Sequence, residues 1–348
     1  MKKKDQFCYT DHARKEVIRK HWCKEQIKIL HSTLGKKLIY LGLPGIEGLD
    51  ILEWIDYLEK VIVFQCSEYK NSKNKTEQFD FVHLTELLEN LDKSEKIKTY
   101  ALFRGFIEDI VIGGFDENGG VFDIKDFVTV YNLDFCNGLT TPRNTRDLKG
   151  NIISYFKIDV IKKLVQYQNE LCEQCNGKHF IFYMTVHSNF LESNMDEIDS
   201  QEITLFRKKF KSVTKGKNTL AVRDLKAYTY FKLAEIFKEN SFHFEFLPPI
   251  FYQGSEYPNR EKGGKLENHW MLTFTILGTK NTTKNDVYQQ DMKKYLEDKF
   301  VFASNTKFQL FNDAHFPFSE NDYTPSAKEL LINSYIFKNY WLPLNYDK

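Results

Sequence analysis

The sequence predicts an α/β fold: a doubly wound, mostly parallel sheet of seven strands whose last two strands form an antiparallel hairpin. Three observations support this prediction. Short apolar segments alternate with amphipathic segments through the first half of the chain, and residues 61–66 form a nearly continuous apolar run, typical of strands buried on both faces. The last two apolar segments follow each other without a helix between them. We therefore expect those two to pair antiparallel, whereas the earlier ones form right-handed βαβ units.

The composition limits the function. The 348 residues include 49 basic and 48 acidic side chains, which give a formal net charge of +1. The whole molecule is therefore no electrostatic attractor for nucleic acid or anionic membranes, and such binding would need a local patch. No apolar run reaches the length of a membrane-spanning helix, and residues 1–6 lead into a charged helix instead of a signal-peptide core. We expect a cytoplasmic protein without membrane contact.

The six cysteines are too scattered for a disulfide framework, so reduced thiols are expected. Cys172 and Cys175 form one CxxC pair. A structural zinc site needs two more ligands, and no second pair accompanies this one. We therefore expect no metal and interpret the pair as a polar helix end.

The first half of the chain supplies five strands with helices between them. An amphipathic helix with a basic face is expected at residues 12–30; the basic face is a solvated surface or, alternatively, a nucleic-acid contact. Strands are predicted at residues 37–42, 61–66, 98–103, 126–135 and 179–186, and helices at residues 49–59, 81–91 and 151–172. Ligands of such a sheet bind beyond the carboxyl ends of its strands.

The second half begins with a polar, charged insertion at about residues 189–220. A helix at residues 224–239 and strands at residues 242–247 and 269–277 follow it. From residue 286 onward, a short helix and an aromatic segment are expected to lie against the main body. We therefore divide the chain into an amphipathic helical segment (1–36), an α/β domain (37–280) and a helical and aromatic extension (281–348).

The most informative stretch is residues 38–48, where an apolar strand leads into a glycine-containing turn and then into a helix. Gly42, Gly45 and Gly48 allow a sharp turn and a close approach of the backbone to a ligand. The helix that follows points its free N–H groups at the same place. Nucleotide-like cofactors bind at such turns. A tight turn without a ligand shows the same pattern, so this stretch alone leaves both interpretations open.

Five strands that alternate with helices, followed by a terminal hairpin, make the chain resemble class I S-adenosylmethionine-dependent methyltransferases over about residues 12–280. In its size and its helix-then-glycine opening it is most similar to the three-Cys-motif partner proteins of bacteria. The resemblance implies S-adenosylmethionine as the cofactor. A dinucleotide-dependent enzyme is less favoured, because a nicotinamide-type domain would continue with parallel strands.

In this family the turn after the first strand cradles the amino-acid part of the cofactor, and Gly42, Pro44, Gly45 and Gly48 match that turn. Tyr40 stands where the family has an acid that holds the cationic amine of the cofactor. A phenol offers only a neutral hydroxyl there. The resemblance therefore implies a cofactor site at this turn with a weakened contact to the amine.

Four further residues match cofactor contacts of the family. Gln65 stands near the acid that accepts hydrogen bonds from both ribose hydroxyls, and Glu68 would take this role if the second strand is longer. Glu108 and Asp109 follow the third strand, near where the family contacts the adenine. Alternatively, these two carboxylates only begin a helix or loop.

The fourth strand ends at the family's catalytic position. The resemblance implies that Asn132 and Asp134 align an attacking amine, and Asp134 resembles the acid of Asp-Pro motifs, although Phe135 replaces the proline. Cys136 lacks the Pro-Cys context of cytosine C5 methylation and is expected to pack. His187 is an acid or base, or only a polar strand end.

The basic insertion offers a local patch. Lys208, Lys209 and Lys211 alternate with phenylalanines and are candidates for binding the phosphates of a nucleic acid; a solvated helix and loop explains them equally. Two functions therefore stand side by side. The chain is an S-adenosylmethionine-dependent methyltransferase acting on nucleic acid or another polar substrate, or a catalytically degenerate methyltransferase-like scaffold that binds a partner protein in a bacterial anti-phage type of complex.

Overall fold

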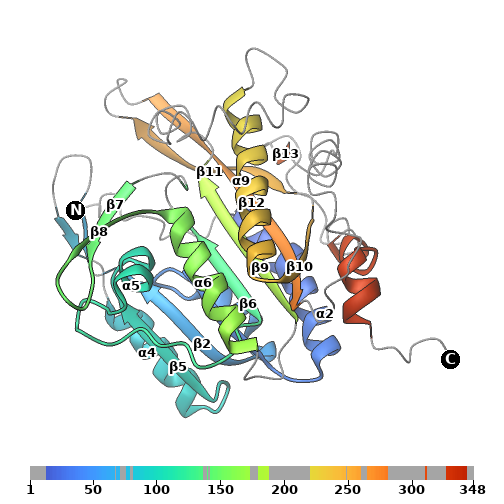
Figure 1. Ribbon diagram of the computed structural model, residues 1–348, viewed down its shortest axis with the longest axis horizontal. Coiled ribbons are helices and arrows are strands. Elements are labelled where there is room, and N and C mark those ends of the chain that lie inside the picture. Colours follow the sequence, from blue (N-terminus) through green and yellow to red (C-terminus); the bar gives the residue numbers. More distant parts are fainter. Residues whose placement is uncertain are drawn as a thin grey trace.

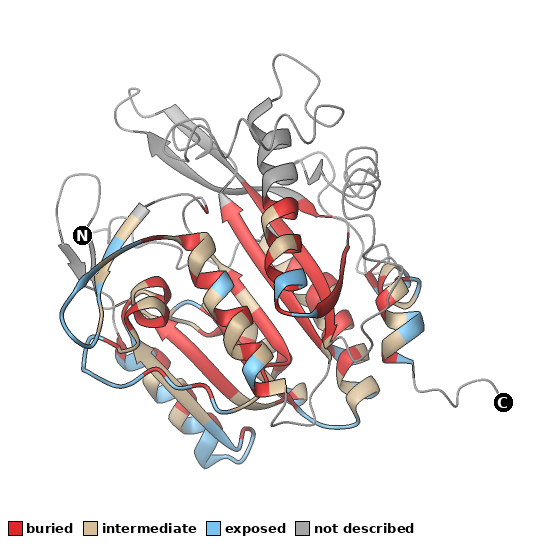
Figure 2. Cartoon of the chain, in the orientation of Figure 1, coloured by how far each residue is buried: buried red, intermediate tan, exposed pale blue. Residues whose placement is uncertain are grey.

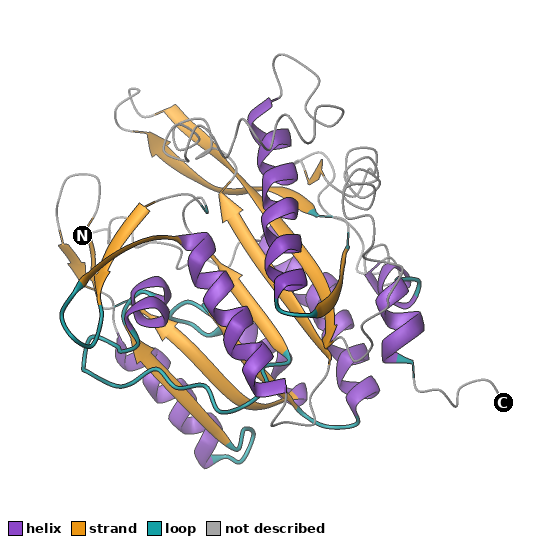
Figure 3. Cartoon of the chain, viewed as in Figure 1, coloured by secondary structure: helices purple, strands orange, loops and turns teal. Residues whose placement is uncertain are grey.

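The computed structural model describes residues 13–66, 68–70, 76–78, 81–135, 139, 142–172, 179–187, 220–247, 249–259, 265–280, 310–311 and 327–342. A single large sheet with helices on both faces forms the body of this part of the chain (Figures 1 and 3). Its strand order is β13-β11-β12-β9-β6-β1-β2-β5, and β10 also pairs with β12.

Five strands of the sheet are parallel: β1 (Leu38–Gly42), β2 (Leu58–Gln65), β5 (Thr99–Arg104), β6 (Val130–Asp134) and β9 (His179–His187). The long strand β12 (Lys265–Lys280) runs antiparallel to β9. Two strands, β10 (Phe242–Phe246) and β11 (Ile250–Asn259), pair antiparallel with successive parts of β12 and so share one position in the sheet. The predicted mostly parallel, seven-stranded sheet with an antiparallel C-terminal pair is confirmed; β13 (Leu310–Phe311) adds a short edge strand.

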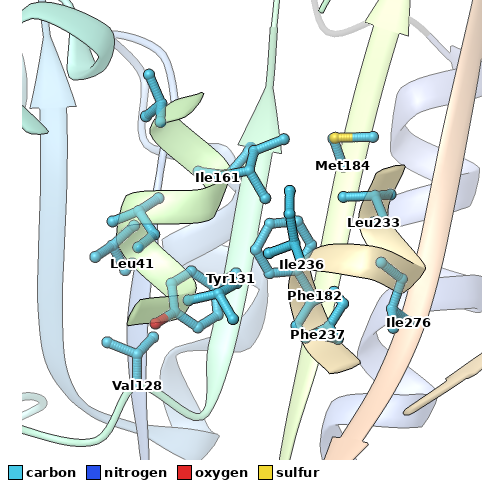
Figure 4. Packing of buried hydrophobic residues seen from close by; sticks show 14 of the residues in the cluster. Leu41, Val128, Tyr131, Ile161, Phe182, Met184, Leu233, Ile236, Phe237 and Ile276 are labelled. Carbon is cyan, nitrogen blue, oxygen red and sulfur yellow. The ribbon is translucent and has the colours of Figure 1, made fainter. Parts of the chain in front are cut away.

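Two hydrophobic cores lie on opposite faces of the sheet, because side chains alternate along each strand. The first core is covered by α5 (Ile107–Gly113), α6 (Lys157–Cys172) and α9 (Leu220–Glu239). Figure 4 shows Ile161 of α6 and Phe237 of α9 packed beside Tyr131 and Phe182 of the strands. Figure 2 shows the central strands buried between helices whose outer sides are more exposed.

The second core is covered by a continuous N-terminal helical segment and by two later helices. The N-terminal segment consists of α1 (Ala13–Val17), the π-helix η1 (Ile18–Cys23) and α2 (Lys24–Leu34). The later helices are α3 (Leu49–Trp54), continued by the 3₁₀ turn η2 (Ile55–Tyr57), and α4 (Phe81–Lys93). Each presents an apolar stripe to the sheet and polar residues to solvent, as expected for amphipathic helices.

The C-terminal segment packs on the same core, as expected for its aromatic residues. It comprises helical residues 327–332 and the π-helix η8 (Phe337–Trp341). Trp341 is 1% exposed, and its ring centroid lies 5.7 Å from that of His179. The buried carboxylate of Glu245 accepts a hydrogen bond from the backbone N–H of Ile336 at 3.0 Å. Strands β9 and β10 therefore hold this segment by a ring contact and a hydrogen bond, respectively.

The largest difference from the prediction concerns residues 151–172. The helix begins only at Lys157, and the residues before it form β8 (Ile152–Phe156), which pairs with β7 (Pro142–Arg146) in a separate hairpin. The Asp147 side chain fixes the turn by accepting hydrogen bonds from the backbone N–H groups of Lys149 and Asn151. β-branched residues at positions 152 and 153 favour the strand, a preference that the amphipathic pattern of the following residues concealed.

Smaller differences concern element ends and short hairpins. Strand β6 is shorter than the predicted 126–135, and β2 is longer than 61–66. Helix α5 and the hairpin of β3 (Glu68–Lys70) and β4 (Thr76–Gln78) were not predicted. The insertion lies outside the described residues as far as position 219. Within the described residues, every helix is too short or too polar to traverse a lipid bilayer.

Candidate functional site

Polar side chains of two central strands meet at the carboxyl edge of the sheet, on the face of the second core. Tyr40 of β1 pairs in register with Val130 of β6, and Gly42 pairs with Asn132. Because side chains two residues apart share a face, Tyr40, Gly42, Asn132 and Asp134 all face the same way. The two strands therefore bring the predicted catalytic pair beside the predicted cofactor turn.

The glycines of the turn are required for different reasons. A Cβ atom at Gly42 would lie 2.4 Å from the Tyr40 hydroxyl and 2.6 Å from the Asn132 carbonyl oxygen. Gly48 begins α3 with φ of 58°, and a Cβ atom there would lie 2.5 Å from Leu87. Gly45 has φ of 69° and no described atom within 4 Å of a Cβ position. Packing therefore excludes side chains at two glycines, whereas the third borders open space.

Tyr40 fills the position beneath the turn. Its side chain is fully buried, and its hydroxyl has no hydrogen-bond partner among the described residues. Burial, and after it the charge of Asp50, raises the pKa of this phenol well above its ordinary value, although the Asn132 amide beside it acts in the opposite direction. A neutral hydroxyl without a partner among the described residues thus lies at the position where the sequence resemblance led us to expect a carboxylate.

Asp50 is a site residue that the sequence did not indicate. It lies in the first turn of α3, where its Oδ1 accepts a hydrogen bond from Nε of Arg19 at 2.6 Å and its Oδ2 accepts one from Nδ2 of Asn132 at 2.6 Å. Burial raises the pKa of Asp50, and the guanidinium of Arg19 acts against that shift. Asp50 therefore fixes the Asn132 amide and is itself neutralised by the N-terminal helical segment.

The same segment also reaches Asp134. Nζ of Lys15 in α1 lies 2.5 Å from Oδ2 of Asp134, with 28% and 29% of the two side chains exposed. Both Arg19 and Lys15 therefore pair with acids of the candidate site. Their separations in sequence, 31 residues for Arg19 and Asp50 and 119 for Lys15 and Asp134, explain why no local pattern could reveal them.

The predicted ribose contacts lie at the ends of the neighbouring strands. The Gln65 side chain at the end of β2 makes one long hydrogen bond, 3.4 Å, to the carbonyl of Cys66. Burial raises the pKa of the Cys66 thiol to about 11, so this cysteine is protonated at neutral pH. Glu68 begins β3, and its side chain lies outside the described part of the chain.

Glu108 and Asp109 lie in the first turn of α5, and both carboxylates have partners in the protein. Glu108 pairs with Lys157 at 2.9 Å, and both side chains are about 5% exposed or less. Asp109 pairs with Arg143 at 3.1 Å and accepts a hydrogen bond from the Tyr155 hydroxyl at 2.6 Å. Both carboxylates thus connect α5 to the β7–β8 hairpin and α6; an adenine contact by either stays a prediction.

Other candidates lie outside the described residues. These are Cys136, Lys208, Lys209, Lys211 and the side chain of His187. In the part that the structure describes, no three His, Cys, Asp or Glu side chains are placed to hold a metal ion.

The order and directions of the strands define a class I methyltransferase-like fold: five parallel strands, an antiparallel strand beside the fifth, and an edge strand beyond it. No protein-family model matches the sequence, and no curated protein matches it either.

Among solved structures, 58 chains match this fold. One is the YcgJ protein of Bacillus subtilis, with 10% identity and a TM-score of 0.35 over 74% of this chain and 98% of that one. A second is precorrin-6y C5,15-methyltransferase of Geobacter metallireducens, with 10% identity, a TM-score of 0.31, and coverage of 74% and 88%. A third is a SAM-dependent methyltransferase of Agrobacterium tumefaciens, with 12% identity, a TM-score of 0.29, and coverage of 72% and 61%. At such values these similarities add nothing to the strand order.

The residues at the edge suit an adenosyl ligand unequally. The weakly bonded amide of Gln65 suits a ribose hydroxyl, and the exposed Gly45 leaves room for a ligand at the turn. A cationic amine needs an acceptor, yet Asp50 and Asp134 are paired with Arg19 and Lys15, and Tyr40 offers a neutral hydroxyl. A hydrogen-bonding group for a ribose hydroxyl is therefore present as the chain stands, whereas an acceptor for the amine becomes available only after a basic side chain has moved.

Proposed function

We propose that the chain is a methyltransferase-like protein that binds an adenosyl compound, S-adenosylmethionine above all, at the turn of residues 42–48. One observation carries the proposal: Asn132 and Asp134 converge with Asp50 beside an open glycine turn at the carboxyl edge of the sheet. Ligands of open α/β sheets bind at this edge, where strand order reverses around the first strand.

The ligand and the protein would contribute different parts of a methyl transfer. S-adenosylmethionine supplies an activated methyl group when it is bound. Gln65 would hydrogen-bond a ribose hydroxyl, and the backbone at Gly45 would approach the ligand closely. The Asn132 amide, held by Asp50, would orient an attacking group, and Asp134 would accept its proton or align its lone pair. Nucleic acid is one substrate class to test, with Lys208, Lys209 and Lys211 as its phosphate contacts.

A second function is favoured by a different observation. Tyr40 fills the space over Gly42, and the chain's own basic residues neutralise Asp50 and Asp134. These features suit a catalytically inactive methyltransferase-like subunit that binds a partner protein in a bacterial defence type of complex. Such a protein would keep the fold but would bind the methyl donor weakly or not at all.

Calorimetry with S-adenosylmethionine and S-adenosylhomocysteine on the full chain separates the two functions. The first function predicts saturable binding, and Gly45→Arg should abolish it by filling the open space at the turn. Gly35→Arg is a matched control, because Gly35 has a similar φ of 62°, equally open surroundings, and a position at the opposite end of β1.

The two outcomes have different meanings. Binding that survives in Gly45→Arg, or that is lost equally in Gly35→Arg, would show that the ligand does not use this turn. Binding weaker than millimolar for both compounds in the unmodified chain would eliminate the enzyme and leave the scaffold.

A further inference from the structure

The Lys15 ammonium group occupies the end of the predicted catalytic strand. Its nitrogen lies 2.5 Å from Oδ2 of Asp134, a residue that follows it by 119 positions. The pair is partly shielded from water, with less than a third of each side chain exposed. A lysine from another part of the chain thus lies where the amine of a substrate would meet the acid of a methyltransferase-like site.

Three polar side chains, those of Asn132, Asp50 and Tyr40, lie near this pair and form a polar corner with it. Asn132, two residues before Asp134 on the same face of β6, donates its amide to Asp50. Tyr40 points its fully buried, unpartnered hydroxyl into the same corner, beside Asn132. A buried hydroxyl without a partner costs free energy, so its presence indicates that this corner is arranged for a polar group beyond those already bonded.

The charges of the corner favour one kind of ligand. Arg19 pairs with Asp50, and Asp134 is the carboxylate that remains in this group of described residues once Lys15 is removed. A neutral nucleobase amine in place of Lys15 would leave that partly buried carboxylate without a counter-charge, whereas an alkylammonium would preserve both the charge and the hydrogen bond. A lysyl ligand would also have the same four-carbon side chain as Lys15, which occupies this position.

We propose that Asp134 is a binding subsite for a primary alkylammonium group, and that Lys15 is an internal occupant which such a ligand displaces. The ligand is a lysyl side chain of a protein or a free polyamine. A role of this amine as the methyl acceptor would rest on the proposed methyltransferase function. Binding of the ammonium group at Asp134 does not depend on that function.

Chemical rescue tests the subsite. Lys15→Ala empties it while removing a partly exposed side chain, so the variant is expected to fold. n-Butylammonium should then raise its melting temperature saturably by about 2 °C at tenfold excess over the dissociation constant. The unmodified chain, in which Lys15 competes for the subsite, should show the same rise only at a much higher concentration of n-butylammonium. n-Butanol, which has the same length without the charge, should have no effect on either protein.

Lys24→Ala is the matched control. Lys24 forms an ion pair of 2.6 Å with Glu53, with exposures of 31% and 19%, but its partner lies in α3 away from the end of β6. At the same concentration of n-butylammonium, the rise should be confined to Lys15→Ala and should disappear in Lys15→Ala/Asp134→Asn. An equal rise in Lys24→Ala, an equal effect of n-butanol, or no rise in Lys15→Ala would overturn the proposal.

The two ligand sources are then compared on Lys15→Ala with N-acetyl-lysine amide and with spermidine. The compound with the lower half-saturation concentration identifies the source. This experiment also separates the subsite from the proposed function. Rescue by amine without binding of S-adenosylmethionine would retain the subsite and reject the methyltransferase, whereas cofactor binding without rescue would reject the subsite alone.

Discussion

Tyr40 largely determines the character of the carboxyl edge beneath the glycine turn. The sequence indicated that a phenol replaces the expected acid, and the structure adds that the phenol is fully buried and has no partner for its hydroxyl among the described residues. Its ring passes over Gly42, where any side chain would collide with it. Tyr40 therefore brings no charge to this position and fills the space over Gly42 with its ring.

Tyr40→Phe should not destabilise the protein. Removing a buried hydroxyl without a partner eliminates a desolvation cost, so the free energy of unfolding should stay equal or rise by about 1 kcal/mol. Urea unfolding measures the change. Tyr131→Phe is the matched control: the Tyr131 hydroxyl is equally buried but donates to Gln168 at 2.9 Å, so its loss should cost about 1 kcal/mol. A clear loss in Tyr40→Phe would mean that its hydroxyl is satisfied in solution.

At the scale of elements, α5, α6 and the β7–β8 hairpin are joined by one buried and one partly exposed ion pair. The Glu108–Lys157 pair connects the first turn of α5 to the first residue of α6. The guanidinium of Arg143 in β7 lies 4.2 Å from the centroid of the Phe106 ring while it pairs with Asp109. Gly113 ends α5, and a Cβ atom there would lie 2.6 Å from the carbonyl oxygen of Arg146. These contacts hold the hairpin against α5, at the side of the third parallel strand.

Lys157→Met should destabilise the protein by about 3 kcal/mol, because it leaves the Glu108 carboxylate buried without its counter-charge. Urea unfolding at neutral pH measures this loss. Lys93→Met is the control, since the Lys93–Glu89 pair is 71% and 44% exposed and its removal should have no measurable effect. The double variant Lys157→Met/Glu108→Leu should recover most of the loss. Equal stability of Lys157→Met and Lys93→Met would show that the buried pair is not formed.

The same pair predicts an acid dependence with a definite sign. Burial opposes ionisation of Glu108, but Lys157, backbone N–H groups and Arg143 together outweigh it and hold the pKa of Glu108 below its ordinary 4.5. The pair therefore contributes stability above about pH 4.5, and this contribution is lost as pH falls through the lowered pKa.

Unfolding followed from pH 7 to pH 3 checks this dependence. Glu108→Gln should flatten the acid limb of the stability curve, because the titrating group is gone. In Lys157→Met, burial acts with less opposition and raises the pKa of Glu108, so that variant should lose less stability on acidification than the unmodified protein. Parallel acid limbs in all three proteins would contradict the assignment.

The elements differ in how far the sequence could specify them. Strands β1, β2, β6 and β9 were predictable because each is an apolar run largely buried between two helical layers, and β5 was predictable from its apolar residues although it is a partly exposed edge strand. Strand β8 was missed because its residues lead directly into α6, so the helical pattern extends over them. The turn and the polar end of β6 were predictable from local sequence. The ion pairs of Arg19 and Lys15 were not, because long-range pairs leave no periodic pattern.

At the scale of the whole molecule, both ends of the described chain pack on the same face of the sheet. The N-terminal segment contributes Trp22, whose indole donates to Thr275 of β12 at 2.9 Å, and the C-terminal segment contributes the Tyr340 ring, which stacks on His243 of β10 at 4.7 Å. Figure 1 shows α2 and the C-terminal helix beside the sheet on the side of β10 and β12. The first and last described helices are therefore parts of one core, and the carboxyl edge is reached by the N-terminal one.

A nucleic-acid partner, if the chain has one, must be bound by a local patch, because the net charge of the whole molecule is only +1. We expect the triple substitution of Lys208, Lys209 and Lys211 by Glu to weaken retention of a DNA or RNA duplex. It should also reduce the slope of log affinity against log salt by about 0.9 for each phosphate that a lysine no longer neutralises. Binding measured at several salt concentrations gives this slope.

The control must change the net charge equally at another place. Lys36, Lys37 and Lys96 are exposed and cluster at the opposite edge of the sheet, near the start of β1, where Lys37 donates to the carbonyl of Lys96. Their triple substitution by Glu alters the net charge by the same amount. If the insertion binds phosphates, only the first variant shows a smaller salt slope. An equal reduction in both variants would indicate a general charge effect, and an unchanged slope in both would remove nucleic acid as a partner while leaving the adenosyl and ammonium sites to be judged by their own experiments.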